Sequence, residues 1–120
     1  MELSNVDIGV DYKELGTSLD QALLDNATFV GRASGRSMEG VGIFDGDLLV
    51  INRALSVRSG DVIVAVYNGV FVCKIVDLNN NALLSASDEY PPIKIKPSDE
   101  FSLEGILTSS IRLHRPSASL

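Results

Sequence analysis

The stretch VIVAVYNGVFVCKIV, residues 62–76, decides the fold class of this chain. Two runs rich in Val and aromatic residues, at 62–67 and 71–76, flank the pair Asn68-Gly69. Asn-Gly favours a two-residue type I′ turn, because both of its positions need a positive φ angle. The stretch therefore predicts a β-hairpin.

Weaker signals on either side of the hairpin predict one helix and further strands. Ser18 and Gln21 have the spacing of a capping box, which predicts a two-turn helix over residues 18–25. The glycine-rich segment 34–47 is expected to form a shaped loop. Strands are expected at 28–33, 48–52, 82–86 and 101–113, a turn at 79–81, and an edge strand or loop at 90–100. Strands dominate without βαβ alternation, so we expect a mainly β fold built on a curled, largely antiparallel sheet.

The length, charge and composition of the chain limit the kinds of protein that it can be. A chain of 120 residues has room for one domain, expected at 28–120 after an N-terminal arm with the short helix at 1–27. Ten Lys and Arg against sixteen Asp and Glu give a net charge of -6, so direct nucleic-acid binding is not expected. Cys73 is the only cysteine, which excludes an intrachain disulfide and fits a reducing compartment. Without a long apolar run or a signal-peptide pattern, we expect a cytoplasmic protein with no membrane contact.

Lys74 is out of place in the second run of the hairpin. Strand alternation puts Val72, Lys74 and Val76 on one face, and the other face is apolar too, so neither face is reserved for water. A desolvated ammonium has a lowered pKa and can accept a proton near neutral pH. The alternative is an edge-strand lysine whose amine reaches water or guards the edge against aggregation.

Ser37 is the candidate nucleophile. It lies in Ser34-Gly35-Arg36-Ser37-Met38, a tight loop that can present a hydroxyl to solvent beside free backbone N–H groups. Serine beside glycine is also common in ordinary turns. A serine hydroxyl needs a base, and Lys74 is one of few that this chain offers, so the two features support each other.

The remaining titratable residues favour structural roles. His114 is the only histidine and lies in the polar tail, which argues against a Ser-His-Asp triad. Asp45, Asp47 and Asp61 fall beside glycines in turns, where Asp caps backbone N–H groups. No pattern points to a metal or a bound cofactor.

Four ordered segments together resemble the LexA/UmuD family of Ser-Lys self-cleaving proteins, which shares its serine-lysine centre with signal peptidases. They are ASGRSM (33–38), DGDLLVI (45–51), SGDVIVAVYNGVFVCKI (59–75) and a closing strand around EGIL (104–107). The resemblance covers about residues 28–113 and implies a sheet domain of the LexA C-terminal and signal-peptidase type. It implies that Ser37 is the nucleophile and Lys74 the general base of a serine peptidase.

Within the family, the stretch NATFVGRASGRSM (26–38) resembles UmuD more than the repressors, and no helix-turn-helix pattern precedes it. The resemblance implies an accessory protein of SOS mutagenesis that acts after DNA damage. It also implies a homodimer, or a heterodimer with a UmuD-like protein, that joins a UmuC-type Y-family polymerase at RecA filaments for translesion synthesis.

Two departures qualify the resemblance. Arg36 stands where the family often has a small or acidic residue, which bears on substrate preference. The family cuts itself at a Cys-Gly or Ala-Gly bond, and neither pair occurs in these 120 residues, so we expect no self-cleavage of the usual kind. The sequence thus resembles the processed short form, UmuD′.

Two alternatives stay open: a trans-acting peptidase that cuts the arm of a related protein, and a repressor-type dimerisation domain. The arm and the strand at 101–113 are expected to supply the subunit contact, through unpaired backbone groups.

Overall fold

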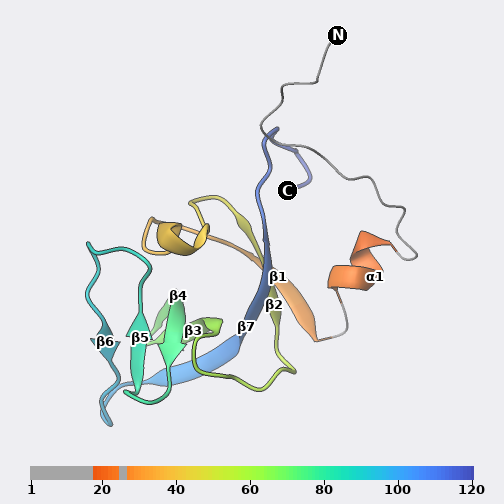
Figure 1. Cartoon of the computed structure of the whole chain (residues 1–120). Coiled ribbons are helices and arrows are strands. Elements are labelled where there is room, and N and C mark those ends of the chain that lie inside the picture. Colours follow the sequence, from red (N-terminus) through yellow and green to blue (C-terminus); the bar gives the residue numbers. More distant parts are fainter. Residues whose placement is uncertain (1–17, 25–26) are drawn as a thin grey trace, which may run out of the picture.

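The computed structural model describes residues 18–24 and 27–120, so residues 1–17 and 25–26 of the arm predicted at 1–27 lie outside the described residues. One antiparallel sheet of seven strands, in the order β1-β2-β7-β3-β4-β5-β6, forms the body of the domain (Figure 1). The strands are β1 (Thr28–Arg32), β2 (Leu48–Asn52), β3 (Val62–Tyr67), β4 (Val70–Asp77), β5 (Ala82–Leu84), β6 (Ile93–Lys94) and β7 (Phe101–Ile111). A short helix, α1 (Leu19–Leu23), and a 3₁₀ turn, η1 (Glu39–Val41), complete the elements. The predicted mainly β, antiparallel fold is confirmed.

The hairpin predicted from Asn68-Gly69 joins β3 to β4. Tyr67 pairs with Val70, which leaves a two-residue loop. Asn68 has φ of 48° and Gly69 has φ of 83°, so both loop residues occupy the left-handed region that a type I′ turn requires. The local prediction is confirmed, and β4 begins at Val70, one residue earlier than expected.

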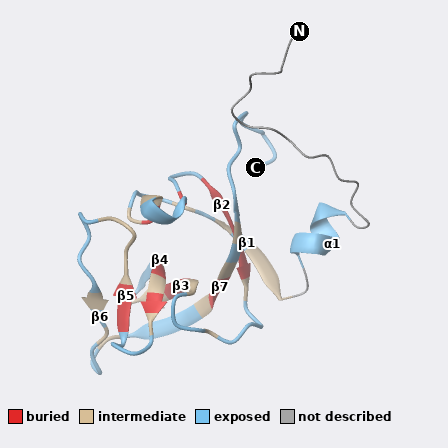
Figure 2. Cartoon of the chain, viewed as in Figure 1, coloured by how far each residue is buried: buried red, intermediate tan, exposed pale blue. Residues whose placement is uncertain are grey.

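β7 lies in the middle of the sheet, between β2 and β3. β2 pairs with β7 over residues 106–111 and β3 pairs with it over residues 101–106, so each neighbour covers about half of one edge, and the predicted subunit contact through its unpaired backbone stays a prediction. Register shifts on each side, at Val50/Ile51 and at Val64/Ala65, let this long strand bend. The edges of the sheet are β1 and β6, and the buried residues gather on the strands between them (Figure 2).

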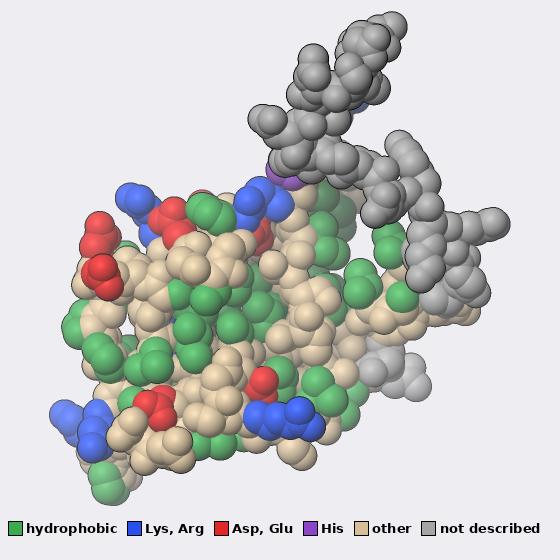
Figure 3. Space-filling view, viewed as in Figure 1, with side chains coloured by type: hydrophobic (Ala, Val, Ile, Leu, Met, Phe, Trp, Pro, Cys, Tyr) green, Lys and Arg blue, Asp and Glu red, His purple; other side chains and the backbone are tan. Residues whose placement is uncertain are grey.

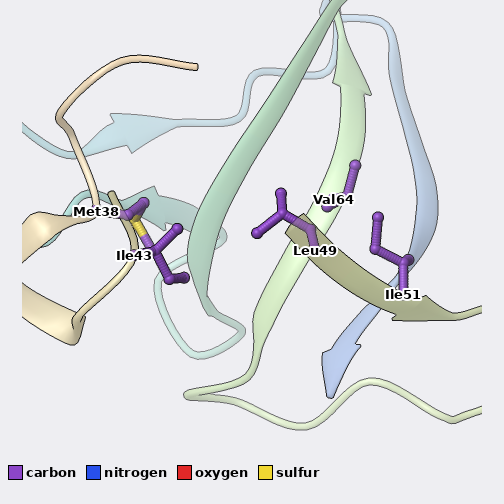
Figure 4. Close-up of a cluster of buried hydrophobic side chains, with 5 residues drawn as sticks. All are labelled: Met38, Ile43, Leu49, Ile51 and Val64. Atoms are coloured by element: carbon purple, nitrogen blue, oxygen red, sulfur yellow. The ribbon is translucent and has the colours of Figure 1, made fainter. Parts of the chain in front are cut away.

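Two apolar clusters pack on opposite sides of the sheet. Val64 of β3 points into one cluster, whereas its neighbours Ile63 and Ala65 point into the other, as strand alternation requires. The first cluster, drawn in Figure 4, joins the loop after β1 to the sheet. Its buried members are Met38, Ile43, Leu49, Ile51 and Val64. Met38 follows Ser37 directly, so this core fixes the loop that carries the candidate nucleophile.

Four predicted elements are shorter in the structure: the helix, and the strands predicted at 28–33, 82–86 and 101–113, of which the first and last end at Arg32 and Ile111. Ser18 does cap the helix, accepting a hydrogen bond from the Gln21 N–H at 3.2 Å, but the helix ends at Leu23 because Leu24 has extended backbone angles. The strand predicted at 82–86 ends at Leu84. This strand ends early because Ala86 does not pair with β4. The Ala86 N–H instead donates to the Ser37 carbonyl oxygen at 2.7 Å.

Candidate active site

The Ser37 loop is fixed first by hydrogen bonds to the turn before β2. The Ala33 N–H donates to the Asp47 carbonyl at 2.8 Å, and the Gly46 N–H donates to the Ala33 carbonyl at 2.9 Å. The Asp45 carboxylate accepts the Gly35 N–H at 2.8 Å, as an Asp in a turn was predicted to do. These bonds hold the chain just before Ser37 in one conformation.

A second set of bonds ties the loop to the segment after β5. Besides the bond from Ala86 to Ser37, the Gly40 N–H donates to the Ala86 carbonyl at 2.9 Å. We call these two bonds, Ala86 N to Ser37 O and Gly40 N to Ala86 O, the Ala86 clamp. A Cβ atom at Gly40 would lie 2.3 Å from the Ala86 oxygen, so the approach is too close for any residue other than glycine. The clamp sets the distance between the Ser37 loop and the strands that carry Lys74.

An ion pair between the buried Asp47 and the exposed Arg112 anchors the far end of the loop. Asp47 has an almost fully buried side chain that accepts two hydrogen bonds from Arg112, at 2.9 and 3.0 Å, and one from the Phe44 N–H at 2.9 Å. These bonds, those of Arg112 first, lower the pKa of the Asp47 carboxyl. Arg112 also donates to the Gly42 carbonyl at 3.0 Å. The pair thus ties the chain just after β7 to the loop.

Lys74 is buried, with 9% of its surface exposed. Burial lowers the pKa of its ammonium, and the charge interaction with the neighbouring Cys73 acts in the opposite direction. The prediction of a lysine with a lowered pKa is therefore confirmed in direction. The Lys74 Nζ donates to the Ser85 Oγ at 2.6 Å, and it lies 5.6 Å from the centre of the Tyr90 ring. The same burial raises the pKa of Cys73 to about 11, so its thiol is protonated and inert near neutral pH.

Ser37 and Lys74 line the same pocket, of about 170 Å³. The structure thus brings the two predicted site residues together from elements far apart in the sequence. The hydrogen bond of the Lys74 amine goes to Ser85 rather than to Ser37. The other residues of the pocket are Ala33, Ser34, Gly35, Met38, Ile43, Phe71, Val72 and Cys73.

The pocket lies along an open edge of β4. Four consecutive residues, 71–74, line it, and consecutive residues of a strand point to opposite faces, so the pocket meets the strand from its side. β5 pairs with β4 only over Ile75, Val76 and Asp77, which leaves 71–74 beyond the end of that pairing. A second, more apolar pocket adjoins the first and shares Ala33, Ser34 and 71–73 with it. Together they form a groove between the Ser37 loop and β4.

The other residues singled out from the sequence lie away from this pocket or serve the backbone. His114 is exposed in the C-terminal tail, and the Asp61 carboxylate accepts the Arg58 N–H at 2.7 Å. Arg36 is exposed and pairs with Glu39 at 2.6 Å. Across residues 18–24 and 27–120, no group of three or more His, Cys, Asp or Glu side chains is placed to hold a metal ion.

Two residues of the site were missed by sequence reasoning. Ser85 and Tyr90 approach Lys74 from the segment that follows β5, which the sequence predicts only as a strand end and a loop. Ser85 could have been found from the register between β4 and β5. Ile75 pairs with Leu84, so Ser85, the residue after β5, lies opposite Lys74.

Comparison with known proteins identifies the family of this chain. A model of the family described as Peptidase S24-like matches residues 5–108. The chain belongs to the Peptidase S24-like family. This confirms the LexA/UmuD resemblance at the level of the family, and the motifs that carried it, around Ser37 and Lys74, lie within the matched residues.

Three curated relatives of this S24 domain are named LexA repressor. The protein from Alcanivorax borkumensis is 38% identical over 87 residues, which cover 71% of this chain and 42% of the relative. Those from Alteromonas mediterranea and Bordetella avium are 38% and 31% identical, over 85% and 89% of this chain and 51% and 52% of each relative. The chain therefore spans about half the length of the curated relatives it matches. In the described part of the S24 domain, no helix has the length and apolar character needed to cross a membrane.

Proposed function

We propose that this S24 domain is a serine peptidase centre that accepts an extended segment of a LexA- or UmuD-like polypeptide. The observation that carries the proposal is the shared pocket, in which Ser37 lies with a buried lysine of lowered pKa. A general base needs a pKa near the working pH, and burial moves Lys74 in that direction.

In the proposed reaction, the neutral Lys74 amine removes the proton from the Ser37 hydroxyl while Oγ attacks the carbonyl carbon of the substrate. The peptide C–N bond then breaks, the protonated lysine returns its proton to the leaving amine, and water later cleaves the acyl ester. Within the described residues, the backbone N–H groups of Ser37 and Met38 make no hydrogen bond. These two donors are available to stabilise the oxyanion.

The groove supports an extended peptide as the substrate. Residues 71–74 of β4 lie beyond the end of the β5 pairing, so a peptide can add to this edge as a further strand. Phe71, with 70% of its surface exposed, stands at the rim of both pockets. In the view of Figure 3, hydrophobic side chains gather near the middle of the face while charged ones lie mainly toward its periphery. The second pocket is lined mainly by apolar side chains, among them Phe29, Leu49 and Val64, so an apolar segment fits the groove better than a charged one.

The bond cut in the family does not occur in these residues, since neither Cys-Gly nor Ala-Gly is present. The substrate segment is therefore one from outside residues 1–120, such as the arm of a related protein. We expect the purified chain to cleave an arm-bearing UmuD-like protein in trans, and Ser37→Ala and Lys74→Met to abolish the cleavage. Ser56→Ala is the control, because Ser56 is exposed and does not line either pocket of the groove. Cleavage that survives Ser37→Ala refutes the proposal.

We also propose that the domain acts as a UmuD′-like dimer that assists a UmuC-type Y-family polymerase at RecA filaments. β1 is an edge strand, with Val30 half exposed, and a groove beside it is lined by apolar side chains of α1, β1, β2 and β7, among them Leu23 and Ile111. A second copy can cover this groove and pair with the edge.

Sedimentation tests the dimer first. We expect a dimer at micromolar concentration and a monomer for Val30→Asp, whereas Val70→Asp, at an exposed valine on the hairpin, stays dimeric. Co-sedimentation with a purified UmuC-type polymerase and with RecA filaments then tests the partners, and Ser37→Ala should bind like the wild type. A wild type that binds neither partner contradicts the accessory role and leaves a repressor-type dimerisation domain as the alternative.

A further inference from the structure

Ser85 faces Lys74 across the sheet. Ile75 pairs with Leu84 at the end of β5, and continuing this antiparallel register by one residue places Ser85 opposite Lys74. The 2.6 Å distance from the Lys74 Nζ to the Ser85 Oγ is that of a short, charge-assisted hydrogen bond. An ammonium has no lone pair, so the Ser85 oxygen is the acceptor.

The Ser85 hydroxyl is held firmly in this position. On one side it follows β5, and on the other it precedes Ala86, whose two clamp bonds attach the segment to the Ser37 loop. The oxygen is therefore fixed relative to both members of the proposed pair. Ser85 itself is not among the residues that line the pocket.

We propose that Ser85 is a positioning residue that holds the Lys74 amine toward Ser37; the inference rests on the peptidase proposed above. The neutral amine has two N–H groups and one lone pair. By accepting one N–H, the Ser85 oxygen fixes the rotation of the amine and leaves the lone pair free for the Ser37 proton. Without it, the flexible lysine side chain samples other rotamers within the pocket.

This role predicts opposite effects on basicity and on rate. A hydrogen bond accepted from the ammonium favours the charged form, so Ser85→Ala lowers the pKa of Lys74 further. More of the lysine is then neutral at a given pH, yet the reaction slows because the amine is no longer oriented toward Ser37. The other groups that act on the Lys74 amine are Cys73, through a charge interaction, and the Tyr90 ring, 5.6 Å away, and neither is changed by this substitution.

The experiment uses a fluorophosphonate probe and the full chain. Ser37 Oγ forms a bond to phosphorus, fluoride leaves, and Lys74 takes the hydroxyl proton, so the labelling rate reports the pair without a peptide substrate. Rates are measured up to the pH plateau, and the pKa of Lys74 is followed separately by NMR of labelled lysine. Ser87→Ala is the matched control, because the Ser87 hydroxyl on the same segment accepts the Glu89 N–H, at 3.3 Å, and does not contact Lys74 among the described residues.

For Ser85→Ala we expect a plateau rate about 10- to 100-fold lower, as for a misplaced catalytic group, together with a lower pKa of Lys74. Ser85→Thr, which keeps the hydroxyl, should recover most of the rate, and Ser87→Ala should label like the wild type. An unchanged plateau rate in Ser85→Ala, or label found on Ser85 instead of Ser37, overturns the inference alone. A wild type that takes no label refutes the proposed peptidase and the inference with it.

Discussion

Replacing Gly40 by alanine tests whether the Ala86 clamp holds the site together. The new Cβ would lie 2.3 Å from the Ala86 oxygen, 3.1 Å from its carbonyl carbon and 3.2 Å from its Cβ, whereas ordinary contact begins at 3.4 Å. The neighbouring backbone must therefore move by about 1 Å. A flexible side chain could rotate away, but a backbone carbonyl held between two hydrogen bonds cannot.

The expected loss of stability follows from these contacts. Overpacking of this kind costs roughly 1–3 kcal/mol. Each of the two clamp bonds contributes about 1 kcal/mol and is weakened when the segments separate. We expect Gly40→Ala to lower the free energy of unfolding by about 2–4 kcal/mol in urea titrations, with an unchanged slope.

Gly31→Ala is the matched control for this experiment. A Cβ at Gly31 would meet only the Ile51 Cδ1, at 3.5 Å, which is ordinary van der Waals contact. Because alanine also loses less backbone entropy than glycine on folding, we expect a change within about 0.5 kcal/mol or a slight gain. If Gly40→Ala is as stable as Gly31→Ala, the Ala86 clamp does not hold the loop as described.

Three further predictions concern stability. Leu83→Ala removes a fully buried side chain and should cost about 2–5 kcal/mol by urea unfolding; a smaller loss would mean that the core closes over the cavity. Gly69→Ala forces a Cβ onto a residue with φ of 83° and should cost about 1–2 kcal/mol in the same assay, unless the turn changes type. Because the pKa of Asp47 is lowered by Arg112, the stabilisation from this carboxylate is complete above its ordinary pKa near 3.8 and is lost as the pH falls through the lowered value. The difference in unfolding free energy between the wild type and Asp47→Asn should therefore shrink in acid, and a constant difference from pH 7 to pH 2 would contradict the ion pair.

Much of the fold could be predicted because its signals are local. Asn68-Gly69 needs only its own positive φ angles to specify the turn, and the runs beside it need only each other to pair. The strand at 48–52 was predicted with the bounds that the structure has, since the shortness of this apolar run favours a strand over a helix. These elements depend on neighbours a few residues away.

The position of β7 could not be predicted in the same way. The sequence of β7 predicts a strand, but it does not indicate that β2 and β3 both pair with this strand. Gly105 carries the clearest trace of this arrangement, because a Cβ there would lie 2.6 Å from Ile51 and 2.8 Å from the Asn52 oxygen. In a sequence alone, such a glycine also fits a bulge or a turn.

The candidate site shows the same division between local and long-range information. Lys74 could be singled out because the residues on both sides of it are apolar, a property that the strand itself displays. Its hydrogen-bond partner depends on the register between β4 and β5, and its place beside Ser37 depends on the Ala86 clamp. The clamp joins segments near the surface, whereas Ile51, Ile63 and Leu83 hold the sheet from within. Local opening of the clamp therefore costs less free energy than global unfolding, and the pocket should lose its geometry before the sheet melts.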